Sequence, residues 1–188
     1  MSFSEKVQVL IEHYDALPKT RSGVPSRRDI NPAQIKDIIS WCMIAVSRSP
    51  RLMELTLCGT SIERILGIHM QGINMFDTYS EEDKDRYEQV FKLMFTQPCG
   101  IKLDRIFTSQ TAGEKHLTMI GLPLSNSDGI VDRMIGVVNT PERPKSDLMM
   151  ELGDTSDLLL TKTLSFEVFD IGHGVPERDF LQPILIPK

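Results

Sequence analysis

Apolar residues recur at intervals of three and four in several stretches of the chain, and this spacing predicts helices. One such stretch runs from Ser4 to Leu17, with Ser4 as a candidate N-cap. A longer one runs from Ser80 to Thr96, and its Ser80 and Asp83 resemble a capping box. A brief helix is also predicted from Pro32 to Ile39. Helices are therefore expected at the start and in the middle of the chain.

Alternating apolar and polar residues predict strands elsewhere. The runs WCMIAVSR and LMELTLCGT are joined by a turn signal at Ser49-Pro50, which predicts an antiparallel hairpin. In the second run Met53, Leu55 and Leu57 alternate with polar residues, so one face of this strand is expected to be buried and the other wet. Three further strand-like runs, separated by turn signals, lie between residues 101 and 140.

The sequence Gly59-Thr60-Ser61 marks a change from strand to helix spacing. Thr60 or Ser61 is a candidate cap for a helix of about two turns. Gly67 would end this helix, and the following segment around Gly72 follows neither regular period, which is typical of a packed loop.

This order of elements predicts an α+β fold: a five-stranded antiparallel sheet with helices on one face, plus an N-terminal helix and a C-terminal extension. We expect the N-terminal helix at residues 1–17, the core domain at 18–140, and a linker with the extension at 141–188. The apolar stripe of the first helix is either a dimerisation face or part of the core. The apolar segment near the end of the chain is a strand, a helix or a tail that depends on a partner.

Composition narrows the function classes. The 188 residues include 21 basic and 26 acidic side chains, for a net charge of -5, which argues against nucleic acid as a partner. The sequence has neither a secretory signal nor an apolar run long enough for a membrane span, so a cytoplasmic location without membrane contact is expected. Three widely separated cysteines predict reduced thiols, and buried, inert ones: Cys42, Cys58 and Cys99.

Motifs of enzymes are missing from the sequence. It has no nucleophile elbow, phosphate loop, dinucleotide fingerprint or zinc motif, and no metal site is predicted. Cys58, with His69 or His116, would be the only nucleophile pair to consider, and packing is the simpler interpretation of Cys58. The acidic residues at the start of the helix after Ser80 suit the helix dipole better than a cation site. A catalytic role is therefore not predicted.

The order of elements and several local motifs resemble a PAS domain, specifically the alphaproteobacterial PAS-like family of short proteins. The runs LPKTRSGVPSRRDINP, CGTSIERILGIHMQG and LPLSNSDGIVDRMIGVV are similar to the family patterns LP.R.diDP, GT.i....G.dltG and LPL..dg..v..ilG. The resemblance extends from about His13 to Thr140. The family's Gly-Thr pair, followed by a helix and a further glycine, is met by Gly59, Thr60, Gly67 and Gly72.

These four residues also have a structural explanation from their chemistry alone. Gly59 would let the backbone turn sharply off the sheet, and Thr60 would cap the short helix. Gly67 and Gly72 would occupy positions that need a positive φ. We therefore expect a structural and not a catalytic role for all of them.

The resemblance implies a module that carries flavin, haem or a small metabolite, or that binds nothing and mediates association. The segment GIHMQGINMF lacks the cysteine of a photoactive flavin site, and the long helix lacks the histidine typical of a haem site. His69, in the loop before that helix, is interpreted as a surface or hydrogen-bonded histidine. The sequence thus gives no support for flavin or haem, and the cofactor stays unknown.

The leading hypothesis is a non-catalytic sensory or protein-interaction module in bacterial signalling, with a small apolar or amphipathic ligand between sheet and helices. The candidates to line that site are Met53, Leu55, Phe76, Phe91, Phe95 and Ile120. The alternatives are a ligand-free adaptor or dimerisation protein and, less favoured, a cysteine-dependent enzyme. A signalling protein is the expected partner, and the N-terminal helix is the candidate surface for a homodimer.

Overall fold

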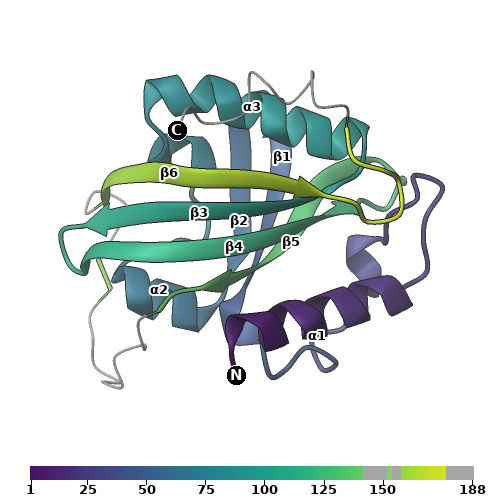
Figure 1. The fold of residues 1–188 in the computed structure, drawn as a ribbon, viewed down its shortest axis with the longest axis horizontal. Helices are drawn as coiled ribbons and strands as arrows, with labels where there is room; N and C mark the ends of the chain where they lie inside the picture. The colour runs from purple at the N-terminus through teal and green to yellow at the C-terminus, as the bar shows by residue number, and fades with distance from the viewer. Residues whose placement is uncertain (142–151, 154–157, 177–188) are drawn as a thin grey trace.

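The computed structural model describes residues 1–141, 152–153 and 158–176. Its centre is one antiparallel sheet with the strand order β2-β1-β5-β4-β3-β6 (Figure 1). The strands are β1 (Cys42–Ser49), β2 (Leu52–Cys58), β3 (Gly100–Ser109), β4 (Gly113–Ser125), β5 (Val131–Asn139) and β6 (Leu158–Phe169). The hairpin and the three later strands predicted from the alternating pattern are present.

The helices are α1 (Phe3–Ala16), α2 (Thr60–Leu66) and α3 (Glu81–Thr96), with 3-10 turns η1 (Arg27–Asp29), η2 (Ile39–Trp41) and η3 (Met75–Thr78). Ser80 caps α3 as predicted, because its side chain accepts from the backbone of Asp83. The N-cap of α1 is Ser2, which forms a full capping box with Glu5, so the prediction of Ser4 as the cap was wrong by two residues.

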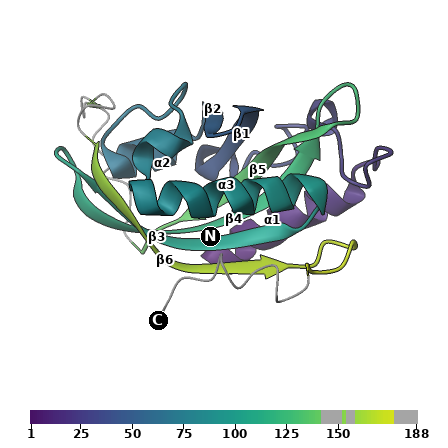
Figure 2. The ribbon, with the colours of Figure 1, turned by 90° about the horizontal axis from the view of Figure 1, so that it is seen from above.

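The two faces of the sheet are both covered. We call the face under α2, η3 and α3 the inner face, and the face under α1 the outer face. In Figure 1, α3 runs along one side of the sheet and α1 along the other, and Figure 2 shows α2 beside α3. The α+β class is confirmed, with the predicted helices after the second strand on one face and the N-terminal helix on the opposite one.

The apolar stripe of α1 is part of the core. Leu10 is fully buried and Tyr14 is 2% exposed, and both pack against the aliphatic outer face of the sheet. The Tyr14 hydroxyl donates a hydrogen bond of 2.7 Å to the carbonyl oxygen of Pro123 in β4. Of the two interpretations that the sequence left open for this stripe, the structure supports packing on the domain.

A β-bulge changes the predicted alternation in β2. Leu55 lies opposite Ala45, but Leu57 lies opposite Ile44, so the register shifts by one residue between them. Leu57 consequently packs with the outer face, while Met53 and Leu55 belong to the inner face. The prediction that all three share one buried face was wrong for Leu57.

The helix predicted from Pro32 to Ile39 is not regular. Its backbone forms successive turns in which an N–H bonds the carbonyl three residues earlier, as from Ile38 to Ile35, and it ends in η2. Ile35 and Ile38 are nevertheless buried against the outer face. The apolar spacing therefore identified the buried side of this segment correctly, although the helix type was wrong.

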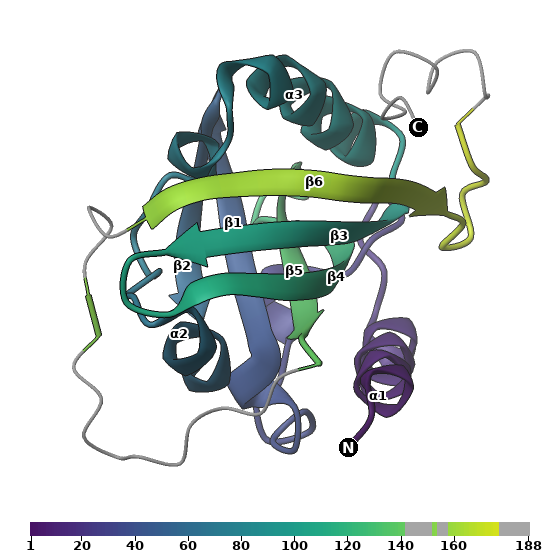
Figure 3. The same ribbon diagram turned by 60° about the vertical axis from the view of Figure 1, so that its left-hand side comes forward.

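The sheet has six strands, one more than the sequence predicted. β6, from the apolar segment near the end of the chain, pairs with β3 from Gly100 opposite Phe169 to Ser109 opposite Leu158 (Figure 3). Phe166 is 8% exposed and Thr161 is 3% exposed on the inner face. Among the three possibilities considered for this segment, a strand is the one observed, and it covers an edge that β3 would otherwise expose.

Candidate functional site

A cavity of about 60 Å³ lies between the inner face and the helices that cover it. Its lining is mostly apolar, and four methionines contribute to it: Met43, Met70, Met75 and Met119. The polar side chains in the lining are Thr78 of η3 and Arg105 of β3, besides the thiol of Cys58. By volume the cavity accommodates a few water molecules or a ligand of a few heavy atoms, and it is smaller than the sites of drug-sized ligands.

Arg105 is the charged residue of this lining. Its Nη2 donates to Thr161 Oγ1 of β6 at 2.7 Å and, at 3.5 Å, approaches Thr78 Oγ1. Its Nε is buried and has no hydrogen-bond partner. Within the described part of the chain, no carboxylate lies within ion-pair distance of Arg105. The groups in contact with the guanidinium are therefore neutral, and Asp83, whose charge acts on the adjacent tyrosines, is paired with Arg86 at 3.4 Å.

Two tyrosines lie beside Arg105 and interact with its charge. Tyr79 and Tyr87 stack with ring centroids 3.9 Å apart and an interplanar angle of 10°. The Arg105 Cζ lies 4.5 Å from the Tyr79 centroid and 5.5 Å from that of Tyr87, which is a cation–π arrangement. Burial raises the pKa of both tyrosines, although the charge of Arg105 acts against this. Both rings are thus neutral at pH 7 and do not neutralise Arg105.

The Tyr79 hydroxyl is a second polar group without a partner. Tyr79 is 6% exposed, and its hydroxyl is buried with no hydrogen-bond partner of good geometry. Burial raises the Tyr79 pKa, and the Arg105 side chain lies close enough to act against this as a donor to the hydroxyl oxygen, which leaves the O–H itself without an acceptor. Buried polar atoms in native proteins are nearly always hydrogen-bonded, because leaving one unpaired costs about 1–3 kcal/mol. Tyr79 and Arg105 thus place two unpaired donors close together at the inner face. A hydrogen-bond acceptor would satisfy either of them.

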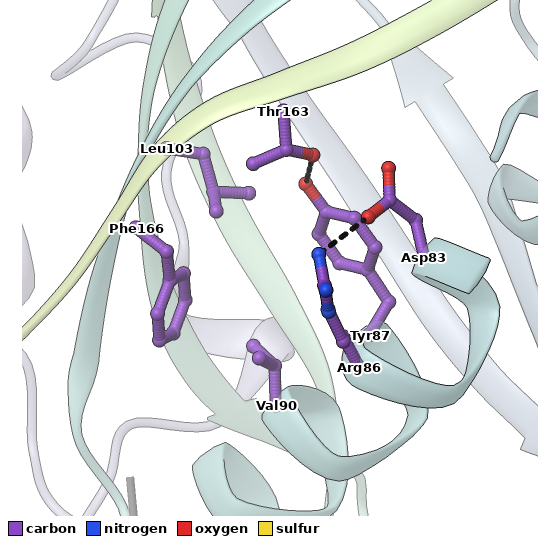
Figure 4. A pocket seen from close by; sticks show the side chains of 7 residues that line it. All are labelled: Asp83, Arg86, Tyr87, Val90, Leu103, Thr163 and Phe166. Carbon is purple, nitrogen blue, oxygen red and sulfur yellow. Dashed lines mark hydrogen bonds and ion pairs between the residues drawn. The ribbon is translucent and has the colours of Figure 1, made fainter. Parts of the chain in front are cut away.

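β6 contacts both η3 and α3 in this region. Tyr87 Oη and Thr163 Oγ1 of β6 share a hydrogen bond of 2.6 Å (Figure 4). Next to this bond lies a small pocket of about 10 Å³, lined by Leu103, Val90 and Phe166 and by the ion pair of Asp83 and Arg86. Thr161 of β6 also donates to the backbone carbonyl of Thr78. The strand therefore fixes both the tyrosine pair and the guanidinium.

A larger groove, of about 350 Å³, opens at the surface between the β1–β2 turn and α3. We call it the hairpin groove. Four of the predicted ligand-site residues line it: Met53, Phe76, Phe91 and Phe95. Its rim carries ion pairs, with Arg48 bonded to Glu54 at 2.7 Å and Arg51 bonded to Glu88 at 2.7 Å. The charges of those two arginines are therefore already compensated.

The other two predicted ligand-site residues lie elsewhere. Leu55 lines the inner cavity. Ile120 is buried on the outer face beside α1, because side chains alternate along β4 and it is Met119 that faces the cavity. Sequence reasoning missed Arg105 as a site residue. The sequence signal that could have identified it is a basic residue in β3 whose side chain, by the alternation of the strand, lies on the same buried face as Leu103 and Phe107.

The four motif residues have structural positions. Gly59 is the N-cap of α2, with no side-chain cap, so the expectation that Thr60 caps this helix was wrong; Thr60 is its first residue. A Cβ on Gly59 would lie 2.3 Å from the Ser40 carbonyl oxygen, so close backbone approach, and not φ, requires glycine there. Gly67 and Gly72 have φ of 71° and 88°, the positive values predicted for them.

The thiols show no sign of activation. Burial raises the pKa of Cys42 and of Cys58 to about 12, and the nearby Glu63 adds to the effect at Cys58. Burial likewise raises the pKa of Cys99 to about 11. A reactive cysteine needs the opposite shift. Among the described residues, no three histidine, cysteine or acidic side chains are grouped as metal ligands.

Comparison with known proteins gives a family for the chain. A family model described as a PAS domain matches residues 3–139, which span α1 to β5. No curated protein and no solved structure matches the chain. None of the helices in the described ranges has the length and apolar character needed to cross a membrane.

Proposed function

The chain belongs to the PAS domain family, and on this premise we propose that it is a non-catalytic sensory module whose small ligand occupies the cavity at the inner face. The observation that carries the proposal is the pair of buried, unpartnered donors, Arg105 Nε and the Tyr79 hydroxyl, one of them on a residue that lines the cavity. Buried polar atoms without partners need a specific explanation, and a ligand that accepts hydrogen bonds from them provides one.

The lining supports a site that adapts to its ligand. Methionine has an unbranched, flexible side chain that refills space after small rearrangements. With four methionines in the lining, rotamer changes can enlarge the cavity beyond its volume of about 60 Å³. The site thus suits a ligand of a few heavy atoms and tolerates some variation in its length.

The contacts of Arg105 suggest how occupancy would reach the surface. Arg105 bonds Thr161 of β6, and its neighbour Tyr87 of α3 bonds Thr163 of the same strand. A ligand on Arg105 would change the position of the guanidinium and with it the geometry of the link between β3 and β6. We propose that a separate signalling protein reads this change, since the expected role involves no catalysis by the chain itself.

The test is ligand-dependent thermal stability with a library of small metabolites. A ligand present at 100 times its dissociation constant stabilises the folded state by about 2.7 kcal/mol. Val138→Ile adds one methylene next to the cavity and should weaken the response, whereas Val137→Ile adds the same group on the outer face and should leave it unchanged. Equal responses of the two variants would contradict the proposed location.

A ligand-free adaptor is the second candidate, and the small volume of the cavity favours it. In that case no compound stabilises the protein, and association provides the function. A homodimer through α1 would have to use the exposed side of the helix, where Gln8 and Glu12 bond each other at 2.8 Å, because Leu10 and Tyr14 are buried. Light scattering of the intact chain over a range of concentrations tests this, and a constant monomer mass would exclude the helix dimer.

A further inference from the structure

We infer that the ligand of the inner cavity is a short-chain monocarboxylate, with its carboxylate on Arg105 and its alkyl chain among the methionines. The inference rests on the proposed function and adds the chemical class of the ligand. It follows from three features of the site: its charge, its donor geometry and its size.

The charge of the site favours an anion. Arg105 is the one charged residue among those that line the cavity. Its contacts are threonine hydroxyls and neutral tyrosine rings. The carboxylate of Asp83, which acts on the same tyrosines, is paired with Arg86 at 3.4 Å, and no described carboxylate forms an ion pair with Arg105. A guanidinium held partly out of water without an anion is unfavourable. A ligand carboxylate would supply the missing negative charge.

The donors of the site suit a carboxylate in particular. The N–H of Nε and one N–H of Nη2 are parallel in arginine and match the two oxygens of a carboxylate. Nε has no partner, and Nη2 donates to Thr161 at 2.7 Å and to Thr78 at 3.5 Å. A carboxylate on Nε and Nη2 would replace the longer of these two bonds. The unpaired hydroxyl of Tyr79, whose ring lies 4.5 Å from the guanidinium carbon, is a third donor beside them.

The size and polarity of the site limit the rest of the ligand. A volume of about 60 Å³ leaves room for a carboxylate and a chain of one to three carbons. A second carboxylate would find no second cation in the lining, and a hydroxyl or amine would face thioethers and aliphatic groups such as Leu66 and Met119. Acetate, propionate and butyrate meet these limits.

The experiment measures binding of these acids to the full chain by calorimetry and by the shift of the thermal midpoint. The sodium salts of acetate, propionate and butyrate are compared with propionamide, disodium succinate and sodium nitrate at one ionic strength. Arg105→Gln removes the charge, and Arg64→Gln removes an exposed arginine charge from α2 as the matched control. Arg105→Lys keeps a cation and replaces Arg105→Gln if that variant does not fold.

The expected result is that a monocarboxylate binds and stabilises the protein, whereas propionamide, succinate and nitrate do so at least about 10-fold more weakly. Arg105→Gln should weaken monocarboxylate binding about 10- to 100-fold, as for loss of a charged hydrogen bond, and Arg64→Gln should not. Arg105→Lys should weaken it about 10-fold, because lysine lacks the paired donors.

The results that overturn the inference are distinct from those that overturn the proposed function. Equal binding of propionate and propionamide, a preference for nitrate or succinate, or unchanged propionate affinity in Arg105→Gln or Arg105→Lys would exclude a carboxylate on Arg105. The cavity would still be a ligand site in those cases if Val138→Ile reduced the response. Absence of any response from these compounds and from the metabolite library would overturn both.

Discussion

The two faces of this sheet are packed with different kinds of side chain. The buried residues of the inner face include seven methionines, namely Met43, Met53, Met70, Met75, Met94, Met119 and Met134. Among the described residues, those buried on the outer face include no methionine and are mostly isoleucine and leucine. Branched aliphatic side chains have few rotamers, whereas methionine is flexible and fills irregular space. The outer face is thus packed with side chains that have few rotamers, and the inner face with side chains that change rotamer easily.

The two faces also differ in whether their buried polar groups are hydrogen-bonded. On the outer face the Tyr14 hydroxyl bonds the Pro123 carbonyl, and the Cys42 thiol donates to the Ile38 carbonyl at 3.4 Å. On the inner face the Tyr79 hydroxyl and Arg105 Nε are unpaired. Satisfied polar groups and dense packing stabilise a fold, whereas a buried unsatisfied polar group needs a specific explanation. The outer face is thus the better satisfied of the two, and the proposed ligand site lies on the inner face.

The largest expected effect compares two residues of β4 that point to opposite faces. Leu122→Ala, on the outer face, should destabilise the protein by about 4 kcal/mol, because a stiff aliphatic core relaxes little around the new space. Met119→Ala, on the inner face, should cost only about 2 kcal/mol, because Met119 already borders a cavity and has flexible neighbours. Urea unfolding of both variants and the wild type measures the difference.

One result of these unfolding measurements would contradict the proposed difference between the two faces. The two side chains are similarly buried, at 1% exposed for Leu122 and 6% for Met119, so burial alone predicts similar losses. Equal destabilisation, or a larger loss for Met119→Ala, would show that the inner face is packed as stiffly as the outer one.

The second prediction concerns β6, which places Phe166 in the inner core, while Phe169 at its end packs against the outer core. Phe166→Ala should destabilise the protein by about 2 kcal/mol, since its ring is buried against the core beneath α3. Leu164→Ala is the matched control on the same strand, because Leu164 is 43% exposed and should cost less than about 0.5 kcal/mol. Urea unfolding provides both values. Similar small losses for the two variants would mean that β6 contributes little to the inner core.

The order of strands and helices was predictable because it depends on local spacing. The period of two in β1 to β5 and the period of three to four in α1 and α3 are direct consequences of backbone geometry, and both appear in the sequence. The resemblance to a PAS domain, carried by the motifs around Gly59 and the last hairpin, is confirmed by the family match. The narrower likeness to the alphaproteobacterial family stays a prediction.

The remaining features depend on contacts between distant segments. The bulge that turns Leu57 to the outer face arises from pairing with β1, and β6 finds its place only through its pairing with β3. The site shows the same limit. The inward position of Arg105 was visible in the alternation of β3, but its lack of a counter-charge depends on what η3, α3 and β6 bring near it. Ile120 was assigned to the site although its neighbour Met119 faces the cavity.

The third prediction uses two thiols as probes of the two faces. Cys42 lies on the outer face and is 1% exposed, and Cys58 lines the inner cavity, yet burial raises the pKa of each to about 12. Both should react slowly with iodoacetamide at pH 7.5, because the thiolate is the nucleophile. Because the two pKa values are alike, the ratio of rates reports access to each thiol, and Cys58 should react faster.

Mass spectrometry of the native protein after timed labelling gives these rates, with labelling in urea as the reference for full access. Faster labelling of Cys42 would reverse the comparison between the faces. Rapid labelling of Cys58 at neutral pH would revive the hypothesis of a cysteine-dependent enzyme, since a raised pKa does not permit it.

The smallest expected effect is a pH dependence that originates on the α1 side of the sheet. His13 of α1 is 7% exposed, and desolvation lowers its pKa, while a hydrogen bond with Gln34 acts in the opposite direction. The backbone N–H of Asn31 donates to His13 Nε2 at 3.4 Å, which requires an unprotonated nitrogen. The unfolded chain therefore takes up a proton more readily than the folded one.

The sign of the pH effect follows from this difference in proton uptake. The contribution of His13 to stability is fully present above the ordinary histidine pKa of about 6.5 and is lost as the pH falls toward the lowered folded pKa. His13→Gln should make the stability less dependent on pH between 7.5 and 5, whereas His116→Gln, at an exposed position, should leave the dependence unchanged. Urea unfolding at both pH values measures it. A pH dependence that His13→Gln does not reduce would mean that protonation of His13 is tolerated, and the packing under α1 would then be less rigid than the aliphatic core implies.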